Sequence, residues 1–351
     1  MARRVRHSSS EKSVTMQSHG KVMIGVCVVA ALSCGSAVAQ WTWTPQTGRF
    51  INIKYMPKET PELQVEHARS LMLKNRYKDA MRETSRFSRV YGDTDFADEN
   101  QFLRGEIRLR QEKYVDAAKE FQRLLAEYPD SDLFDEAIAL QYEIGDSLYE
   151  KGLKRQNRWW IPLRKRPLKR AIQVYSMVIE NQPFTLEAAE AQYKLGLCHY
   201  ARKEYVEAAF EYRRVIEDYG SSEWVGDACH GLAMSYYKAS YPPDYDQTPS
   251  ELAVRTIDDF FARYPADERV GDLQEIRREV REKIAQQRLK VAQFHVKRRE
   301  FDSARIYHEL LVDQYADTEA SARAAKWLQE NPVVETDARR EISDLRRRNV
   351  P

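Results

Sequence analysis

The feature of this sequence that most restricts its fold is a helix ending that recurs along the chain. "EYPDSD" begins at Glu127, and near copies recur as "VYGDTD" from Val90, "DYGSSE" from Asp218, "RYPADE" from Arg263 and "QYADTE" from Gln314. In most copies an aromatic residue precedes proline or glycine, and these residues end a helix or form the turn after it. A chain that ends its helices in one way at intervals is built from repeated units.

Small residues recur in register with these endings. One alanine stands at the same distance before every ending, including a variant in which Gln182 replaces the aromatic residue, and a second small residue lies further upstream. Close approach of two antiparallel helices requires such small residues, so each unit is predicted to be a helix hairpin. The first set is Ala80, Ala117, Ala171, Ala208, Ala253 and Ala304, and the second is Ala68, Gly105, Gly145, Gly196, Ala233 and Ala292.

The repeat resembles the tetratricopeptide family. Its shortest spacing is close to the 34 residues of that repeat, and the longer spacings contain insertions. The matching residues are Leu195, Gly196, Tyr205, Ala208 and Tyr212 in one unit and Gly105, Tyr114, Ala117, Phe121 and Pro129 in another. The resemblance implies an all-α solenoid of about six stacked hairpins over residues 61–330, in which each hairpin buries a face of the next.

Composition and motifs point away from catalysis. Lysine and arginine number 56 against 54 aspartate and glutamate, so the charge balance does not suggest a nucleic-acid binder. We find no phosphate-binding loop, dinucleotide fingerprint, zinc-protease motif or serine-hydrolase elbow. Cys198 and Cys229 are expected to be buried free thiols, and their spacing with the neighbouring histidines does not fit a zinc site. We therefore expect a non-enzymatic binding protein without catalytic residues, cofactor or metal.

The two ends of the chain lie outside the repeats. Residues 1–39 have the pattern of a signal peptide, whose apolar run ends at Ala39 before Gln40. Cys34, in "ALSC", resembles the lipidation site of bacterial lipoproteins, so simple cleavage after Ala39 and lipidation of Cys34 are both open. Either outcome exports the protein, and translation starts at Met1 or Met16. Residues 40–60 are predicted to form an extended leader and residues 331–351 a charged flexible tail.

Two insertions interrupt the repeats. The insertion at 151–170 contains Trp159, Trp160, Arg164, Lys165 and Arg166 and has no acidic residue. Indole rings favour the headgroup layer of a membrane and cations favour anionic lipid, so one hypothesis is contact with an anionic lipid surface. The alternatives are docking onto a partner and a loop whose tryptophans fill a groove. The insertion at 241–250 is predicted to be a structured turn that leads into the next helix.

The last hairpin adds a second resemblance. An uninterrupted helical pattern runs from Gly271 to about Arg298 and ends in "VAQF" from Val291, and "QYADTEA" from Gln314 follows. This order is similar to the outer-membrane protein assembly factors of the BamD family. The resemblance implies a periplasmic scaffold at the inner face of the outer membrane that helps to deliver and fold β-barrel proteins.

The resemblance also suggests where partners bind. The C-terminal hairpins would dock on the barrel-forming partner through the exposed cations Arg281 and Lys283, although these residues also fit a solvated helix face. The N-terminal hairpins would hold unfolded barrel segments. A periplasmic tetratricopeptide adaptor of the Tol-Pal system is the alternative function, but such proteins usually carry a coiled coil before their repeats, and residues 40–61 contain no heptads.

Overall fold

The computed structural model describes residues 41–44, 49–52, 56–156 and 166–332, and the chain divides into two compact units at Thr60 and Pro61. In the first unit β1 (Trp41–Thr44) pairs antiparallel with β2 (Arg49–Asn52), so that Trp41 lies opposite Asn52. The leader was expected only to be extended. The pairing of its two extended segments is a finding of the structure.

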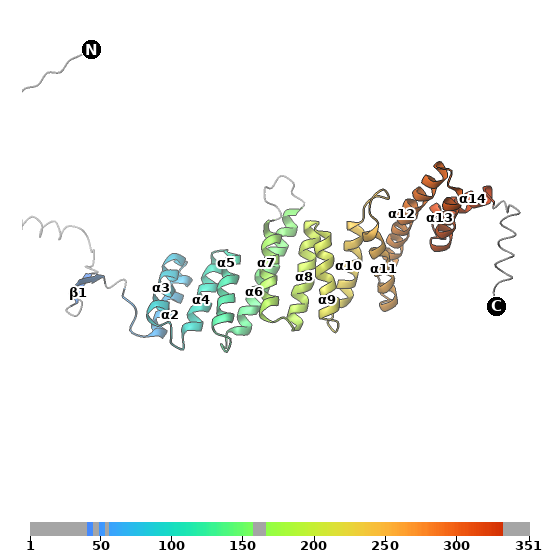
Figure 1. Ribbon diagram of the computed structural model, residues 1–351. Helices are drawn as coiled ribbons and strands as arrows, with labels where there is room; N and C mark the ends of the chain where they lie inside the picture. The colour runs from blue at the N-terminus through green and yellow to red at the C-terminus, as the bar shows by residue number, and fades with distance from the viewer. Residues whose placement is uncertain (1–40, 45–48, 53–55, 157–165, 333–351) are drawn as a thin grey trace, which may run out of the picture. The chain divides into compact units, whose positions relative to one another are not determined.

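The second unit is an all-α array of helix hairpins. In its described part each helix packs against the next in chain order, and α14 also packs against α12 (Figure 1). Six successive hairpins and a terminal helix result, so the predicted repeat solenoid is confirmed. The helices are α2 (Pro61–Leu73), α3 (Tyr77–Val90), α4 (Ala97–Arg110), α5 (Tyr114–Glu127), α6 (Phe134–Gln156), α7 (Arg166–Asn181), α8 (Leu186–Arg202), α9 (Tyr205–Asp218), α10 (Val225–Ala239), α11 (Thr248–Arg263), α12 (Val270–Lys297), α13 (Phe301–Gln314) and α14 (Glu319–Glu330).

The small residues that recur in each hairpin do more than let two helix backbones approach closely. All six alanines that precede the endings are fully buried. In the second hairpin a Cβ added to Gly105 would lie 2.4 Å from the ring of Phe121, and in the fourth a Cβ on Gly196 would lie 2.5 Å from the ring of Tyr212. Gly105 and Gly196 therefore leave room for a buried aromatic ring on the second helix of their hairpin.

Tight turns inside four hairpins share one backbone conformation. Asn75, Glu112, Lys203 and Arg299 have φ values of 58°, 57°, 65° and 60°, which is the left-handed region. Each stands two residues before the aromatic residue that begins the second helix of its hairpin. The hairpins are thus repeated down to their turns, although the sequence contains no glycine there.

The basic insertion is more helical than the sequence suggested. α6 continues through Gln156 and α7 begins at Arg166, so both ends of segment 151–170 extend the third hairpin. The side chain of Lys151 donates to the hydroxyl of Tyr114 and its Nζ lies 3.9 Å from the centre of that ring. Arg166 is exposed. Trp159, Trp160, Arg164 and Lys165 lie outside the described residues, as does Cys34.

The other local expectations can be compared directly. The predicted turn before α11 is ordered by Asp246, whose Oδ1 accepts hydrogen bonds from the backbone N of Thr248 at 3.0 Å and from its hydroxyl at 2.8 Å. Cys198 and Cys229 are buried free thiols, as predicted. Within the ranges that the structure describes, no helix is long and apolar enough to span a bilayer, and no cluster of three or more potential ligands is placed to bind a metal.

Candidate functional site

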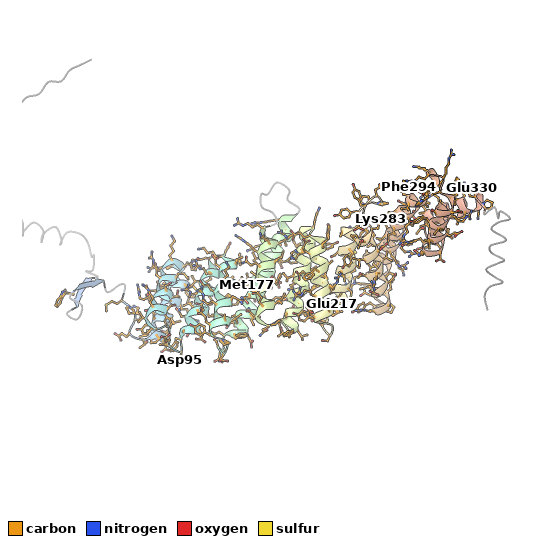
Figure 2. The ribbon with its side chains drawn as sticks, viewed as in Figure 1. Asp95, Met177, Glu217, Lys283, Phe294 and Glu330 are labelled. Atoms are coloured by element: carbon orange, nitrogen blue, oxygen red, sulfur yellow. The ribbon has the colours of Figure 1, made fainter. Side chains whose placement is uncertain are left out.

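An exposed apolar surface on the last hairpin is the strongest candidate for a binding site. Phe294, labelled in Figure 2, lies near the end of α12 and is 52% exposed. Ile306 on α13 is 57% exposed. Large contiguous apolar surfaces on a soluble protein commonly mark sites of interaction. We call this surface the C-terminal patch, and it consists of Phe294, Ile306, Tyr307 and Leu310.

The patch arises because α13 is apolar on two opposite sides. Ala304, His308 and Leu311 are buried and form the core face of this helix. Ile306 and Leu310 stand one turn apart on the other side, where a surface helix normally carries polar residues. The second apolar side has no role in the core of its own hairpin.

Ring contacts hold the two helices of the patch together. The ring of His295 on α12 stacks on Tyr307 of α13 with 5.0 Å between ring centres and an angle of 11° between planes. The guanidinium of Arg298 lies 5.4 Å from the centre of the Phe294 ring. Exposed Lys297 and Arg299 stand beside Arg298 at the same end of α12. Glu300 pairs with Arg298 at 2.9 Å, so the rim beside the patch is basic chiefly through Lys297 and Arg299.

Arg281 and Lys283 are not exposed cations, and this part of the prediction is wrong. The side chain of Arg281 is only 17% exposed, because its guanidinium holds the carboxylate of Asp317 through two nitrogens. Lys283 is partly buried and its Nζ donates to the hydroxyl of Ser240 at 2.9 Å, near the end of α10. Both side chains hold neighbouring helices against the long helix α12. The sequence placed them on a helix but gave no sign of these partners.

The turn between α13 and α14 is the structure that Arg281 holds. Tyr315 lies between two guanidinium groups, with Arg281 and Arg288 each 5.0 Å from the centre of its ring. Next to Arg281, Glu282 accepts a hydrogen bond from the backbone N of Glu319 at 2.7 Å. A carboxylate at a helix N-terminus satisfies free N–H groups and stabilises the helix dipole. These contacts fix α14 and the end of α13, and so support the helix that carries the patch.

Removing the Asp317 carboxylate is expected to weaken this turn. The hydrogen bond from Arg281 lowers the pKa of Asp317, so its contribution to stability is present above the ordinary carboxyl pKa of about 3.9 and is lost as pH falls through the folded pKa. Asp317→Asn should lower the free energy of unfolding by about 1 to 2 kcal/mol at neutral pH. The difference from wild type should shrink below about pH 4.

Denaturant unfolding followed by circular dichroism at several pH values would measure this effect. Asp313→Asn is the matched control, because Asp313 is exposed on α13 and has no ion pair with any residue that the structure describes. Equal stability of Asp317→Asn and Asp313→Asn at neutral pH would show that the Arg281 contact does not hold the turn.

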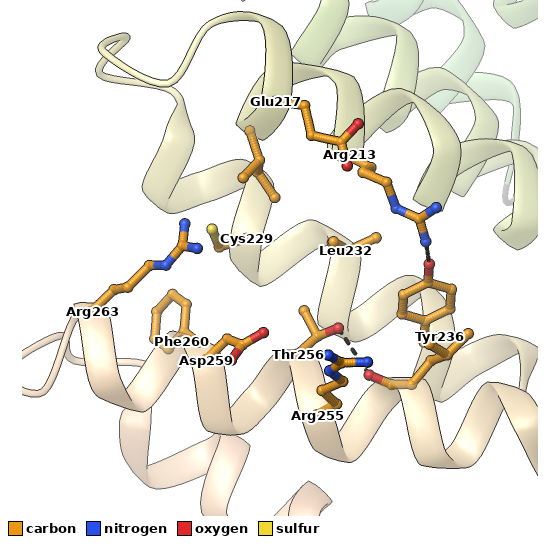
Figure 3. Close-up of a pocket in the computed structure, with 12 residues that line it drawn as sticks. Arg213, Glu217, Cys229, Leu232, Tyr236, Arg255, Thr256, Asp259, Phe260 and Arg263 are labelled. Carbon is orange, nitrogen blue, oxygen red and sulfur yellow. Dashed lines mark hydrogen bonds between the residues drawn. The ribbon is translucent and has the colours of Figure 1, made fainter.

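A cavity of about 380 Å³ lies between α9, α10 and α11 (Figure 3). Arg213 donates to the hydroxyl of Tyr236 at one side, and Cys229 lines the other. Burial raises the pKa of the Cys229 thiol, which keeps it in the protonated and unreactive form. The cavity is lined by both polar and apolar side chains, so it could accept a side chain of a binding partner.

A second cavity, of about 400 Å³, lies among α3, α4 and α5 in the N-terminal hairpins. Asn100 lines it and is buried, and its amide nitrogen donates to the hydroxyl of Ser88 at 3.2 Å. The amide oxygen of Asn100 has no hydrogen-bond partner within the described structure. A buried polar atom without a partner is costly, so this oxygen is a ready acceptor for a donor brought by a bound segment.

Sequence reasoning missed the C-terminal patch although a signal was present. Ile306, Tyr307 and Leu310 fall between the repeat positions that form the core, where earlier hairpins carry mostly polar residues. Large apolar residues at non-core positions of the last hairpin are the observation that would have predicted an interface there.

Comparisons with known proteins give two family matches. Residues 161–334 match the model of the YfiO family, described as an outer membrane lipoprotein, and residues 65–132 match a tetratricopeptide-repeat model. The first match covers the helices that carry the C-terminal patch. A comparison with curated proteins found no match.

Solved structures show distant likenesses. A tetratricopeptide repeat protein from Parabacteroides merdae is 15% identical over 78% of this chain and 100% of its own, with a TM-score of 0.29. A thermophilic repeat protein from Thermus thermophilus is 15% identical over 63% and 98%, with a TM-score of 0.29. These scores are low, so the assignment depends on the hairpins and the family models. Together they identify the chain as a tetratricopeptide-repeat protein whose C-terminal half is similar to the YfiO outer membrane lipoproteins.

Proposed function

We propose that the protein is a non-enzymatic scaffold for the assembly of β-barrel proteins at the inner face of the outer membrane, as in the BamD family. The match of residues 161–334 to an outer membrane lipoprotein family is the observation that carries this proposal. The same residues contain the C-terminal patch, in which the exposed ring of Tyr307 stacks on His295 of the neighbouring helix.

In this proposal the C-terminal patch docks on the barrel-forming assembly partner. Buried apolar and aromatic anchors supply most of the affinity of a protein interface, and Phe294 and Tyr307 are residues of this kind. The basic rim of Lys297 and Arg299 would speed association with an acidic surface. The N-terminal hairpins hold unfolded barrel segments, and the cavity lined by Asn100 supports this role.

The proposal includes a location. Export through the segment 1–39 would place the chain in the periplasm, and lipidation of Cys34 would anchor it to the outer membrane. Cleavage after Ala39 would instead remove the lipid anchor, and the protein would be held at the membrane only by its docking partner. Both modes bring the C-terminal patch to the inner face of the outer membrane.

Depletion of the protein from its native cell tests the function. We expect folded β-barrel proteins to fall in the outer membrane and their unfolded precursors to accumulate in the periplasm. Resistance of the folded barrels to heat and detergent separates the two forms on a gel. Normal levels of folded barrels together with a defect in cell division would contradict the proposal and support a Tol-Pal adaptor.

A further inference from the structure

Charge is divided between the two edges of the helix array. Because the hairpins are antiparallel and stacked, the turns inside hairpins lie along one edge, which we call the tip edge, and the turns between hairpins lie along the opposite edge (Figure 1). In the first three hairpins the tip edge carries many exposed cations. They are Lys74, Arg76, Lys78, Arg110, Lys113, Lys154, Arg155, Arg166, Lys169 and Arg170, and the acids beside them are Asp79, Glu112, Asp116 and Glu150.

The opposite edge carries the reverse charge. Its first two turns contain Asp93, Asp95, Asp98, Glu127, Asp130, Asp132, Asp135 and Glu136, with Arg89 and Arg123 close by. Asp95, on the first of these turns, lies at the lower margin of the array in Figure 2, and exposed Glu217 stands in the last turn of α9, which ends at the same edge. A protein whose total charge nearly cancels is therefore polarised across its helices.

Compensation of helix dipoles explains only part of this pattern. First helices such as α4 and α6 end at the tip edge with basic residues in their last turn, as the dipole favours. The same rule would place cations at the ends of the second helices, on the opposite edge. Among the second helices, α3 has Arg89 and α11 has Arg263 in the last turn, but α5, α7 and α9 have no basic residue there. The cations are concentrated on one edge beyond what the helix dipoles require.

The tips of the first two hairpins enclose a cleft of about 670 Å³. Arg76 pairs with Asp79 at 2.8 Å. Lys78, Arg110 and Lys113 also line the cleft, and none of them forms an ion pair with another residue that the structure describes. The ammonium of Lys151 on the ring of Tyr114 brings the third hairpin beside this cleft. The described ends of α6 and α7 therefore add their cations beside the first two tips.

Apolar side chains project among these cations. Leu73 at the first tip is 63% exposed, and Leu153 near the end of α6 is also exposed. Lys74 follows the first leucine and Lys154 follows the second. Aliphatic residues flanked by cations suit the boundary between lipid headgroups and acyl chains, because the leucine inserts while the cations remain with the phosphates.

We propose that the tips of the first two hairpins, together with the adjoining described ends of α6 and α7, form a docking surface for an anionic phospholipid membrane. Charge complementarity and the leucines favour this occupant over a soluble polyanion, which would gain nothing from Leu73 and Leu153. The surface is built from described residues on both sides of residues 157–165. It does not depend on the proposed role in barrel assembly, and it would turn the acidic edge away from the membrane.

Vesicle flotation tests this proposal with the chain from Gln40, which retains the whole compact unit from Pro61. We expect binding to vesicles that contain phosphatidylglycerol and not to vesicles of phosphatidylcholine alone. The triple variant Lys78→Glu, Arg110→Glu and Lys113→Glu should bind at least about 100-fold more weakly, since each cation near an anionic surface contributes about fivefold. Binding should also fall in about 500 mM salt, where screening is strong.

The variant Arg255→Glu, Arg278→Glu and Lys326→Glu makes the same change of charge at exposed positions away from the tips and should bind like wild type. Equal loss in the two triple variants would overturn the proposal, because net charge and not the tip edge would then govern binding. A Leu73→Ser variant distinguishes lipid from soluble polyanion. Unchanged vesicle binding by this variant, together with competition by inorganic polyphosphate, would assign the surface to a soluble anion and contradict membrane docking.

Discussion

Replacing Phe121 by alanine is expected to lower the free energy of unfolding by about 3 to 5 kcal/mol. Phe121 is fully buried, and its ring occupies the space that Gly105 leaves on the facing helix. It also contacts Phe102, with 5.3 Å between the ring centres. A large cavity would remove contacts in the core that the second hairpin shares with the third, and denaturant unfolding followed by circular dichroism would measure the loss.

The pairing of glycine with an aromatic ring makes a sharper test. Gly105→Ala alone should destabilise the protein by about 1 to 3 kcal/mol through overpacking, although alanine is the better helix former. Adding Phe121→Ile should recover part of this loss, because the fifth hairpin combines Ala233 with a buried Ile257 at the same positions. Wild-type stability of Gly105→Ala would show that the glycine is not needed for the ring.

The double variant Tyr307→Glu and Leu310→Glu is expected to reduce affinity for the docking partner by more than about 100-fold. Both side chains belong to the C-terminal patch and are more than a third exposed. The variant loses the stack of Tyr307 on His295 but keeps the buried face of α13, Ala304, His308 and Leu311, so the hairpin should still fold. A charge buried at an interface without a counter-charge is unfavourable, which adds to the loss of apolar contact. Capture of partners from solubilised envelope, quantified by mass spectrometry, would measure the change.

Phe184→Glu with Val206→Glu is the matched control for this variant. Phe184 is 93% exposed and Val206 is 70% exposed, and neither lies on the last hairpin. This control should retain the partner. If the control and the patch variant lose it to the same extent, the patch is not the docking surface.

The repeat could be predicted from sequence because the signals for it are local. Ala117 and Ala208 lie in register with helix endings, and such periodicity follows directly from helix geometry. The partner of Gly105 was harder to predict. The register of the repeats suggested that the glycine faces the alanine of the second helix. In the structure the space beside the glycine is filled by the ring of Phe121, one turn after that alanine.

The candidate site was harder to predict from the sequence, because it depends on contacts between segments that are far apart in the chain. Arg281 on α12 forms an ion pair with Asp317, which lies 36 residues later in the turn between α13 and α14. Lys283 on α12 donates a hydrogen bond to Ser240 in the preceding hairpin. A helical pattern places both cations on α12 but does not say which side faces a neighbour. The patch residue Ile306 was overlooked for a related reason, since an apolar residue on a repeat helix is first assigned to the core.

Capture of the wild-type protein from detergent-solubilised envelope, followed by mass spectrometry, tests the central claim most directly. The account predicts that the barrel-forming component of the outer-membrane assembly machinery is the principal partner, and that the Tyr307→Glu and Leu310→Glu variant loses it while the Phe184→Glu and Val206→Glu control keeps it. Recovery of Tol-Pal proteins in its place, equally by both variants, would contradict the account.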